Sequence, residues 1–200
     1  MVTAHCPNLD TRIPMSNTPT HLQDAKDLLT ENGFATSNVW YHGTSSALIT
    51  SINESGVNRS GDRDSNKKAK DTMVTIGGSH NESVQPVFLT QSKELAYIWA
   101  AKTVRKRSVR FEGEEMGVVY KVTLDESLNE KVKTDVGAAA MLMVEADDYL
   151  ELLADIYKAN GMEMPNIEPA TADRMVYLNK LGMAYINTNI PVSCIELLTE

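Results

Sequence analysis

The chain has little cysteine and no long apolar run, and each shortage excludes a class of protein. Only Cys6 and Cys194 occur among 200 residues, too few for a disulfide scaffold and without the spacing of zinc ligands. No run of 18 apolar residues predicts a transmembrane helix. Residues 1–14 carry neither a basic cluster nor an apolar core, so no secretory signal is predicted. We therefore expect a protein of a reducing compartment, the cytoplasm, without a membrane anchor.

Several catalytic signatures are also missing. The chain has no GxxxxGK[ST] phosphate loop, no HExxH pair and no CxxC pair. No metal centre is therefore predicted. Ser45 and Ser46 stand close to His42 in the chain, but neighbouring residues rarely align as a nucleophile and its base.

Charge is distributed unevenly along the chain. The net charge is −8, yet residues 57–110 carry 11 basic and 5 acidic side chains. Residues 111–200 carry 6 basic and 17 acidic ones. A basic middle within an acidic chain suits a phosphate-bearing ligand. A solvated lysine-rich loop explains the same run equally well.

Hydrophobic periodicity and capping residues predict a mixture of strands and helices. Strands are predicted at residues 38–41, 87–89, 117–124, 183–186 and 192–198, and helices at 20–33, 44–56, 92–101, 138–160 and 173–181. Residues 57–85 show no clear periodicity and are predicted to be a long loop, of the kind that is usually functional or disordered. The elements do not alternate as βαβ units, which favours an α+β fold. We expect one domain over residues 20–200, after an irregular lead-in over 1–19.

The most informative motif is VWYHGTS at residues 39–45. A short apolar strand that ends in His42 and Gly43 places one imidazole and a bare backbone at the end of a strand. Glycine lets a ligand approach the backbone closely, and the hydroxyl of Thr44 either contacts such a ligand or caps a helix. A lone histidine is more often structural than catalytic, so the downstream motifs decide.

A second strand, PVFLT at residues 86–90, is followed by a helix that carries Tyr97 and Trp99. Each ring taken alone is most simply a core residue. Together with the histidine motif, however, the rings suit a flat, polar ligand held between aromatic side chains. The strand GVVYKV at residues 117–122 completes the pattern.

This pattern resembles the ADP-ribosyltransferases, in the branch of diphtheria toxin and the poly-ADP-ribose polymerases, and also the small antibiotic-modifying transferases. The resemblance runs from Trp40 to Leu124. It implies a split mixed or antiparallel sheet with flanking helices, in which residues 138–182 would be a helical insertion. It implies a mono-ADP-ribosyltransferase that cleaves NAD at the nicotinamide–ribose bond and passes ADP-ribose to a macromolecular acceptor, protein or nucleic acid. The insertion would then bind a target or a neutralising protein, as in a toxin or effector delivered into a host cell.

The resemblance also implies roles by position. His42 is expected to hydrogen-bond a ribose of NAD, and the backbone of Gly43 the nicotinamide amide. Phe88 and Trp99 are expected to sandwich the nicotinamide ring, in place of the tyrosines usual in the family. The further NAD-binding candidates are Tyr41, Thr44, Thr90 and Tyr97. The basic loop over 57–70 would cover the pyrophosphate or select the target.

The catalytic acid is the part of the resemblance that departs most from the family. The family places a glutamate or aspartate against the nicotinamide ribose, where it stabilises the oxocarbenium-like cation. Ala184 stands where polymerase-like members have that acid, so Glu196 in the last strand is the favoured candidate. The alternatives, at the position used by antibiotic-modifying members, are Asp125, Glu126, Glu130 and Asp135. Two other functions stay open: a pseudoenzyme that acts as an interaction protein, and a nucleic-acid-binding or -modifying module that uses the basic middle.

Overall fold

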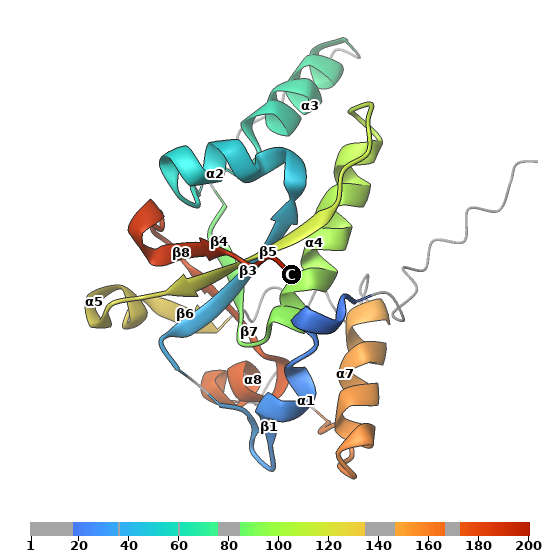
Figure 1. Cartoon of the computed structure of the whole chain (residues 1–200), viewed down its shortest axis with the longest axis vertical. Coiled ribbons are helices and arrows are strands. Elements are labelled where there is room, and N and C mark those ends of the chain that lie inside the picture. The colour runs from blue at the N-terminus through green and yellow to red at the C-terminus, as the bar shows by residue number, and fades with distance from the viewer. Residues whose placement is uncertain (1–17, 36, 60, 76–84, 135–146, 167–172) are drawn as a thin grey trace, which may run out of the picture.

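The computed structural model describes residues 18–35, 37–59, 61–75, 85–134, 147–166 and 173–200 (Figure 1). At its centre is a six-stranded sheet in the order β6-β7-β4-β3-β5-β8, in which every neighbouring pair is antiparallel. The strands are β3 (Val39–Ser45), β4 (Val87–Thr90), β5 (Gly117–Thr123), β6 (Val132–Thr134), β7 (Met183–Ile186) and β8 (Ile195–Leu197). Helices together with an antiparallel sheet confirm the predicted α+β class.

Helices cover both faces of this sheet (Figure 1). They are α1 (Ala25–Leu28), α2 (Ile49–Ser55), α3 (Arg63–Thr75), α4 (Lys93–Ser108), α5 (Glu126–Asn129), α7 (Asp147–Ala159) and α8 (Arg174–Leu181). Within the described ranges, none of them has the length and apolar character needed to cross a membrane.

Helix α4 lies directly against β3, and Gly43 makes this contact sterically feasible. A Cβ built on Gly43 would stand 1.8 Å from the carbonyl oxygen of Ala96. The sequence suggested that this glycine leaves room for a ligand, but the space beside its α-carbon is filled by α4. The helix begins as predicted, because the Ser92 hydroxyl accepts a hydrogen bond from the Leu95 N–H at 3.3 Å. It then continues to Ser108, beyond its predicted end at residue 101.

Apolar side chains form a core on each side of the sheet. On the α2 side, Trp40 is 1% exposed and packs with Ile52 and Tyr120. Its indole N–H donates to Asn129 Oδ1 at 2.8 Å, which ties α5 to β3.

On the other side, α7 covers α4. The buried side chains of this cluster include Leu95, Ile98, Tyr149, Leu153 and Ile156. The described part of the segment predicted to be a helical insertion therefore packs into the core. The start of its predicted helix, residues 138–146, lies outside the described residues.

The predicted helix over residues 20–33 is wrong in length. The chain forms a 3₁₀ turn (Thr20–Leu22), the short α1, and a hairpin of β1 (Leu29–Thr30) and β2 (Gly33–Phe34). The reason is that Asp24 serves another helix. Its carboxylate accepts hydrogen bonds from the Ser92 hydroxyl at 2.6 Å and from the Lys93 and Glu94 N–H groups at 3.2 Å, so it caps α4.

Three further segments differ from the sequence prediction. Residues 63–75, predicted to be loop, form α3, whose first turn is capped by Asp62 Oδ1 accepting from the Ser65 N–H at 3.0 Å. The last predicted strand is shorter, because a 3₁₀ turn (Val192–Cys194) precedes β8. Strand β3 continues to Ser45, four residues beyond its predicted end, so His42 lies in the middle of the strand and not at its end. The other predicted strands are confirmed with small changes in their ends. Of the predicted lead-in, residues 1–17 lie outside the described residues.

Candidate functional site

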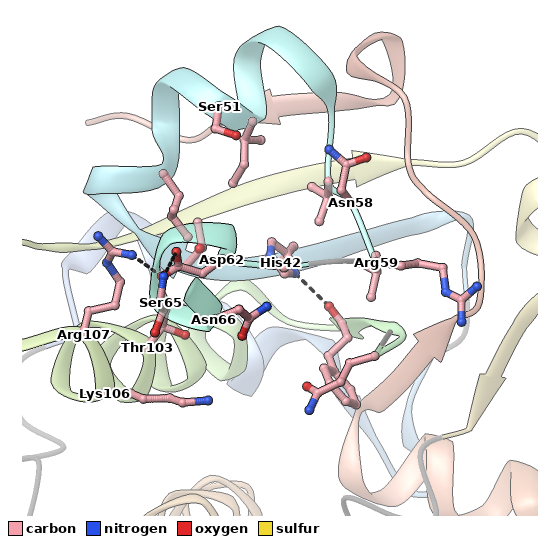
Figure 2. A pocket seen from close by; sticks show the side chains of 18 of the residues that line it. His42, Ser51, Asn58, Arg59, Asp62, Ser65, Asn66, Thr103, Lys106 and Arg107 are labelled. Carbon is pink, nitrogen blue, oxygen red and sulfur yellow. Dashed lines mark hydrogen bonds and ion pairs between the residues drawn. The ribbon is translucent and has the colours of Figure 1, made fainter. Parts of the chain in front are cut away.

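The sheet opens between β3 and β4. Strand β3 pairs with β5 along its whole length, from Val39 to Ser45. Strand β3 pairs with β4 at one position only, where Tyr41 lies opposite Thr90. A pocket of about 400 Å³ lies where the two strands part, between residues 42–44 of β3 and residues 85–88 at the start of β4 (Figure 2). Its remaining walls come from α2, from residues 56–59 and 61–69, from the C-terminal half of α4 and from Arg110 just beyond it.

His42 joins the two sides of this opening. Its Nδ1 lies 2.9 Å from the carbonyl oxygen of Phe88, the contact drawn as a dashed line in Figure 2. A carbonyl oxygen only accepts, so Nδ1 carries the proton and Nε2 of the neutral ring keeps its lone pair. Burial lowers the pKa of His42 below its ordinary value, and the hydrogen bond to Phe88 offsets this only in part. The ring is therefore neutral near pH 7, and Nε2 is an acceptor for a ligand hydroxyl.

Four of the predicted site residues meet at this pocket: His42, Gly43, Thr44 and Phe88. Phe88 is 42% exposed between the buried Val87 and Leu89, so its ring is available for stacking. Thr44 is buried in the same wall.

The two aromatic residues of α4 do not meet Phe88, so the predicted sandwich is not formed. The centroid of the Trp99 ring lies 5.8 Å from that of the Tyr149 ring of α7. Lys102 Nζ lies 5.1 Å from the centroid of the same Trp99 ring. Tyr97 packs against Val119 and Leu22 and stands beside Gly117. Neither Tyr97 nor Trp99 lines the pocket. The direction in which each ring leaves α4 is set by the packing of α4 between β3 and α7.

Tyr41 and Thr90 also lie away from the pocket. Tyr41 is half-buried on the α4 side of the sheet, in a cluster with Ala96 and Val119. The hydroxyl of Thr90 is buried and donates to the Ser92 carbonyl oxygen at 2.6 Å, within the turn that starts α4. Both residues have structural contacts that explain their presence.

The structure does not support Glu196 as the acid beside His42. Its side chain is 69% exposed, and Oε2 lies 3.7 Å from Lys121 Nζ. The register places Glu196 next to Lys121, which in turn pairs with Tyr41. Side chains alternate along β3, so this row faces the side opposite to His42. Because β8 pairs with β5, Glu196 is also separated from the opening by a full strand.

The alternative acids are not in the pocket either. Asp125 caps α5, where its Oδ1 accepts from the Leu128 N–H at 2.9 Å and from the Ser127 hydroxyl at 2.8 Å. Glu126 and Glu130 are exposed on the same short segment. Asp135 lies outside the described residues. Ala184, which stands at the family's usual position for the acid, is 1% exposed and pairs with Leu89 and Thr134. Its methyl side chain supplies no carboxylate there.

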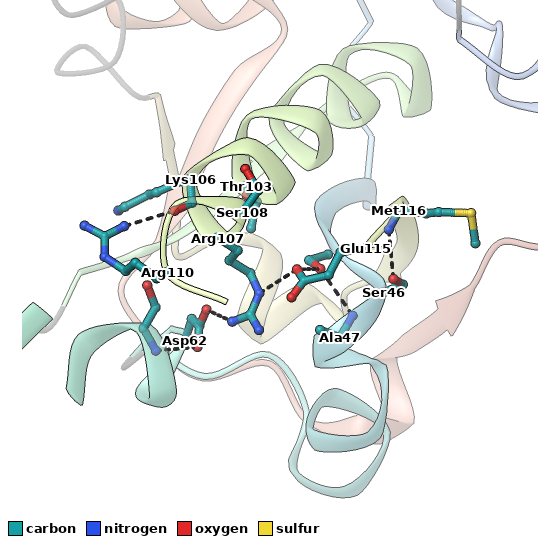
Figure 3. A network of polar contacts seen from close by, with 12 residues as sticks. Ser46, Ala47, Asp62, Thr103, Lys106, Arg107, Ser108, Arg110, Glu115 and Met116 are labelled. Carbon is teal, nitrogen blue, oxygen red and sulfur yellow. Dashed lines mark hydrogen bonds and ion pairs between the residues drawn. The ribbon is translucent and has the colours of Figure 1, made fainter. Parts of the chain in front are cut away.

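Asp62 is the only carboxylate among the described residues that line the pocket. It forms an ion pair with Arg107 of α4, whose side chain is only 7% exposed. The Arg107 Nε also lies 2.7 Å from Glu115 Oε2, and that carboxylate accepts a hydrogen bond from the Ser45 hydroxyl at 2.5 Å (Figure 3). Arg107 holds the pKa of Glu115 below its ordinary value. This network ties the ends of β3, α3 and α4 together around one wall of the pocket.

The pocket is electropositive. Its charged lining residues are Arg59, Asp62, Lys106, Arg107 and Arg110, four cations against one carboxylate. The Nε of Arg59 is buried without a hydrogen-bond partner among the described residues. Such a group is costly unless a partner is supplied, and the surplus of positive charge favours an anionic one.

Sequence reasoning missed Asp62 and Arg107. Arg107 belongs to a charged run that lies beyond the predicted end of α4, and such a run is usually solvated. The one signal was Asp62 itself, because aspartate is a favoured N-cap and Asp62 stands just before the polar stretch that forms α3.

Within the described ranges, no group of three or more His, Cys, Asp or Glu side chains is placed to hold a metal ion. Comparisons of the chain with protein-family models, with curated proteins and with solved structures find no match.

Proposed function

We propose that the protein is a mono-ADP-ribosyltransferase that uses NAD as its substrate. One observation carries the proposal: His42 and Phe88, which belong to the two motifs that resemble ADP-ribosyltransferases, meet in one electropositive pocket. The antiparallel sheet that parts between β3 and β4, with helices on both faces, agrees with the fold that the resemblance implies.

The pocket offers a group for each part of NAD. The exposed face of Phe88 suits the flat nicotinamide ring. Nε2 of His42 suits a ribose hydroxyl, because it accepts a hydrogen bond. Lys106 and Arg110 suit the pyrophosphate. The volume, about 400 Å³, is within the usual range of small-molecule sites.

The reaction breaks the bond between the nicotinamide nitrogen and the ribose C1′. The bonding electron pair stays with nicotinamide and neutralises its positively charged ring. A lone pair of the acceptor nucleophile forms the new bond to C1′, and the nucleophile's proton passes to water. Holding NAD in a fixed position is the main contribution that His42 and Phe88 make to this step.

Asp62 supplies the negative charge of the pocket in this proposal. The cation that develops at C1′ is stabilised by a carboxylate nearby. The ion pair with Arg107 opposes this effect because it neutralises part of that charge. The same observation favours a second candidate function, a pseudoenzyme that binds NAD without cleaving it.

The test combines NAD binding, followed by calorimetry, with nicotinamide release from labelled NAD. His42→Ala removes the hydroxyl acceptor, and we expect binding to weaken about tenfold, the value of one hydrogen bond. Nicotinamide release should fall by more than that, because the ribose is no longer held in place. Asp62→Asn keeps the cap of α3 and removes the charge, so it should slow release and leave binding largely intact.

Glu196→Gln is the matched control, since it removes a carboxylate that faces away from the pocket. Its binding and release should equal those of the wild type. Loss of release in this variant would reject the assignment to the pocket beside His42. Wild-type binding without release would establish the pseudoenzyme, and absence of binding would reject both candidate functions.

A further inference from the structure

A row of lysine and arginine side chains runs along α3 beside the pocket. The face of α3 toward the pocket carries Ser65, Asn66 and Ala69. The next stripe around the helix carries Arg63, Lys67 and Lys70, all exposed, at intervals of four and three residues. At a rise of about 1.5 Å per residue, this stripe extends about 10 Å along the helix.

The opposite wall of the pocket extends the same charge. Lys106 of α4 and Arg110, two residues beyond the end of α4, are exposed and line the pocket. Helix α3 is held against this wall, because Lys68 Nζ donates to the Arg110 carbonyl oxygen at 2.7 Å and lies 4.1 Å from the Phe111 ring centroid. Residues 57–75 and 101–111 together contain ten Lys and Arg against three Asp and no Glu. The whole chain has a net charge of −8, so positive charge is concentrated at the pocket.

Among its described residues, this surface lacks the aromatic centre of a protein interface. In residues 57–75 and 101–111, the large apolar side chains that are strongly exposed are two valines, Val74 at 64% and Val109 at 80%. Interfaces between proteins are usually anchored by buried aromatic and apolar side chains with a polar rim. A surface of cations without such anchors instead suits a chain of phosphates.

We propose that the acceptor of the ADP-ribose is a single-stranded nucleic acid that binds along the α3 stripe and places one nucleotide at the mouth of the pocket, beside the bound NAD. This inference rests on the proposed transferase function. A base within a duplex cannot reach a group inside a pocket, whereas an unpaired base can. The phosphates beside that nucleotide contact Arg63, Lys67 and Lys70. A nucleophilic oxygen or nitrogen of the nucleotide forms the new bond to C1′ and loses its proton to water. Nicotinamide leaves with the electron pair of the bond that breaks.

Binding is tested first, without NAD, by fluorescence anisotropy of labelled 20-nucleotide single strands of RNA and DNA. The wild type should bind a single strand with an affinity that falls steeply as salt rises. Arg63→Glu, Lys67→Glu and Lys70→Glu are combined in one variant. We expect it to bind at least tenfold more weakly, with a salt slope reduced by about 2, or 0.7 for each lost phosphate contact.

The matched control carries the same charge change elsewhere. Lys131→Glu, Lys133→Glu and Lys158→Glu alter three exposed lysines of other elements and should leave the affinity unchanged. A milder variant, Lys67→Gln with Lys70→Gln, should give a smaller loss in the same direction, and it keeps the test valid if the charge reversals disturb folding.

The competing explanations give different results. A duplex that binds as tightly as the single strand would overturn the single-strand assignment. A poly-glutamate peptide that competes as well as the oligonucleotide would point to an acidic protein and overturn the nucleic-acid assignment. Equal binding by the stripe variant and the control would overturn the surface itself.

Transfer is tested second, with labelled NAD and the oligonucleotide. Label should appear on the oligonucleotide with the wild type and the control, and at least tenfold less with the stripe variant. Nicotinamide release to water, without any acceptor, should be the same in all three proteins, because none of the changed residues lines the pocket. Absence of that release indicates failure of the proposed function, whereas release without labelled oligonucleotide indicates failure of the present inference.

Discussion

Replacement of Arg107 by alanine is expected to destabilise the fold strongly, although the side chain belongs to a highly charged part of the sequence. Arg107 is buried between two carboxylates, those of Asp62 and Glu115, whose side chains are 15% and 14% exposed. The three groups connect α3, α4 and the segment that leads into β5 (Figure 3).

The expected magnitude follows from what remains after the change. Arg107→Ala leaves two largely buried carboxylates without their cation, and breaking a buried pair in this way costs about 3–5 kcal/mol. For a chain of this size, each kcal/mol lowers the melting temperature by about 2–4 °C. A decrease of about 6–20 °C is therefore expected. Because Arg107 lowers the pKa of Glu115 in the folded protein, this stabilisation is present above the ordinary carboxylate value and is lost as pH falls through the lowered pKa.

Urea unfolding at pH 7.5 measures this difference, with Lys121→Ala as control. Lys121 also pairs with a glutamate, but the two side chains are 39% and 69% exposed, and such a pair contributes less than about 1 kcal/mol. Combining Arg107→Met with Asp62→Asn and Glu115→Gln should recover much of the loss, since no buried charge then lacks a partner. Equal midpoints for Arg107→Ala and Lys121→Ala would refute the reasoning.

Two other predictions concern β3. Gly43→Ala should destabilise the protein by about 3 kcal/mol or more, because the new Cβ would overlap the Ala96 carbonyl oxygen. Gly117→Ala is the control and should cost about 1 kcal/mol, because its Cβ would lie 3.1 Å from the Cβ of Ala100. Equal urea midpoints for the two variants would contradict the packing described for α4. His42 has a lowered pKa in the folded protein, so the unfolded chain binds its proton first as pH falls below the ordinary histidine value. The stability of the wild type relative to His42→Gln should therefore decrease from pH 7.5 to pH 5.5, and a constant difference across urea titrations in that range would show that the ring is not shielded.

The elements around the opening were predictable because their sequences are locally distinct. Alternating or continuous apolar residues mark β3, β4 and β5, and Ser92 marks the start of α4. Helix α3 was not predictable by periodicity, because it has no apolar stripe. It is held instead by the Asp62 cap and by contacts of Lys68 with residues far along the chain.

The site was predictable only where two residues belong to neighbouring strands. The motif of His42 forms β3 and that of Phe88 forms β4, and the sheet order brings the two strands together. The role expected of Trp99 depended on which neighbour α4 presents it to, and α7 is far away in the sequence. The face of Glu196 followed from alternation, but its distance from His42 depended on β8 pairing with β5, which no local pattern encodes.

The single registered pair between β3 and β4 has a consequence for association with other proteins. A strand that stops pairing exposes main-chain donors and acceptors, and such an edge normally invites a strand of another molecule. Here the edge lies inside a pocket walled by α2, α3 and α4. A foreign strand needs a long open side along which to align, and the helices on three sides restrict its approach. The chain thus keeps main-chain hydrogen-bonding groups within reach of a small ligand while hindering β-pairing with another molecule.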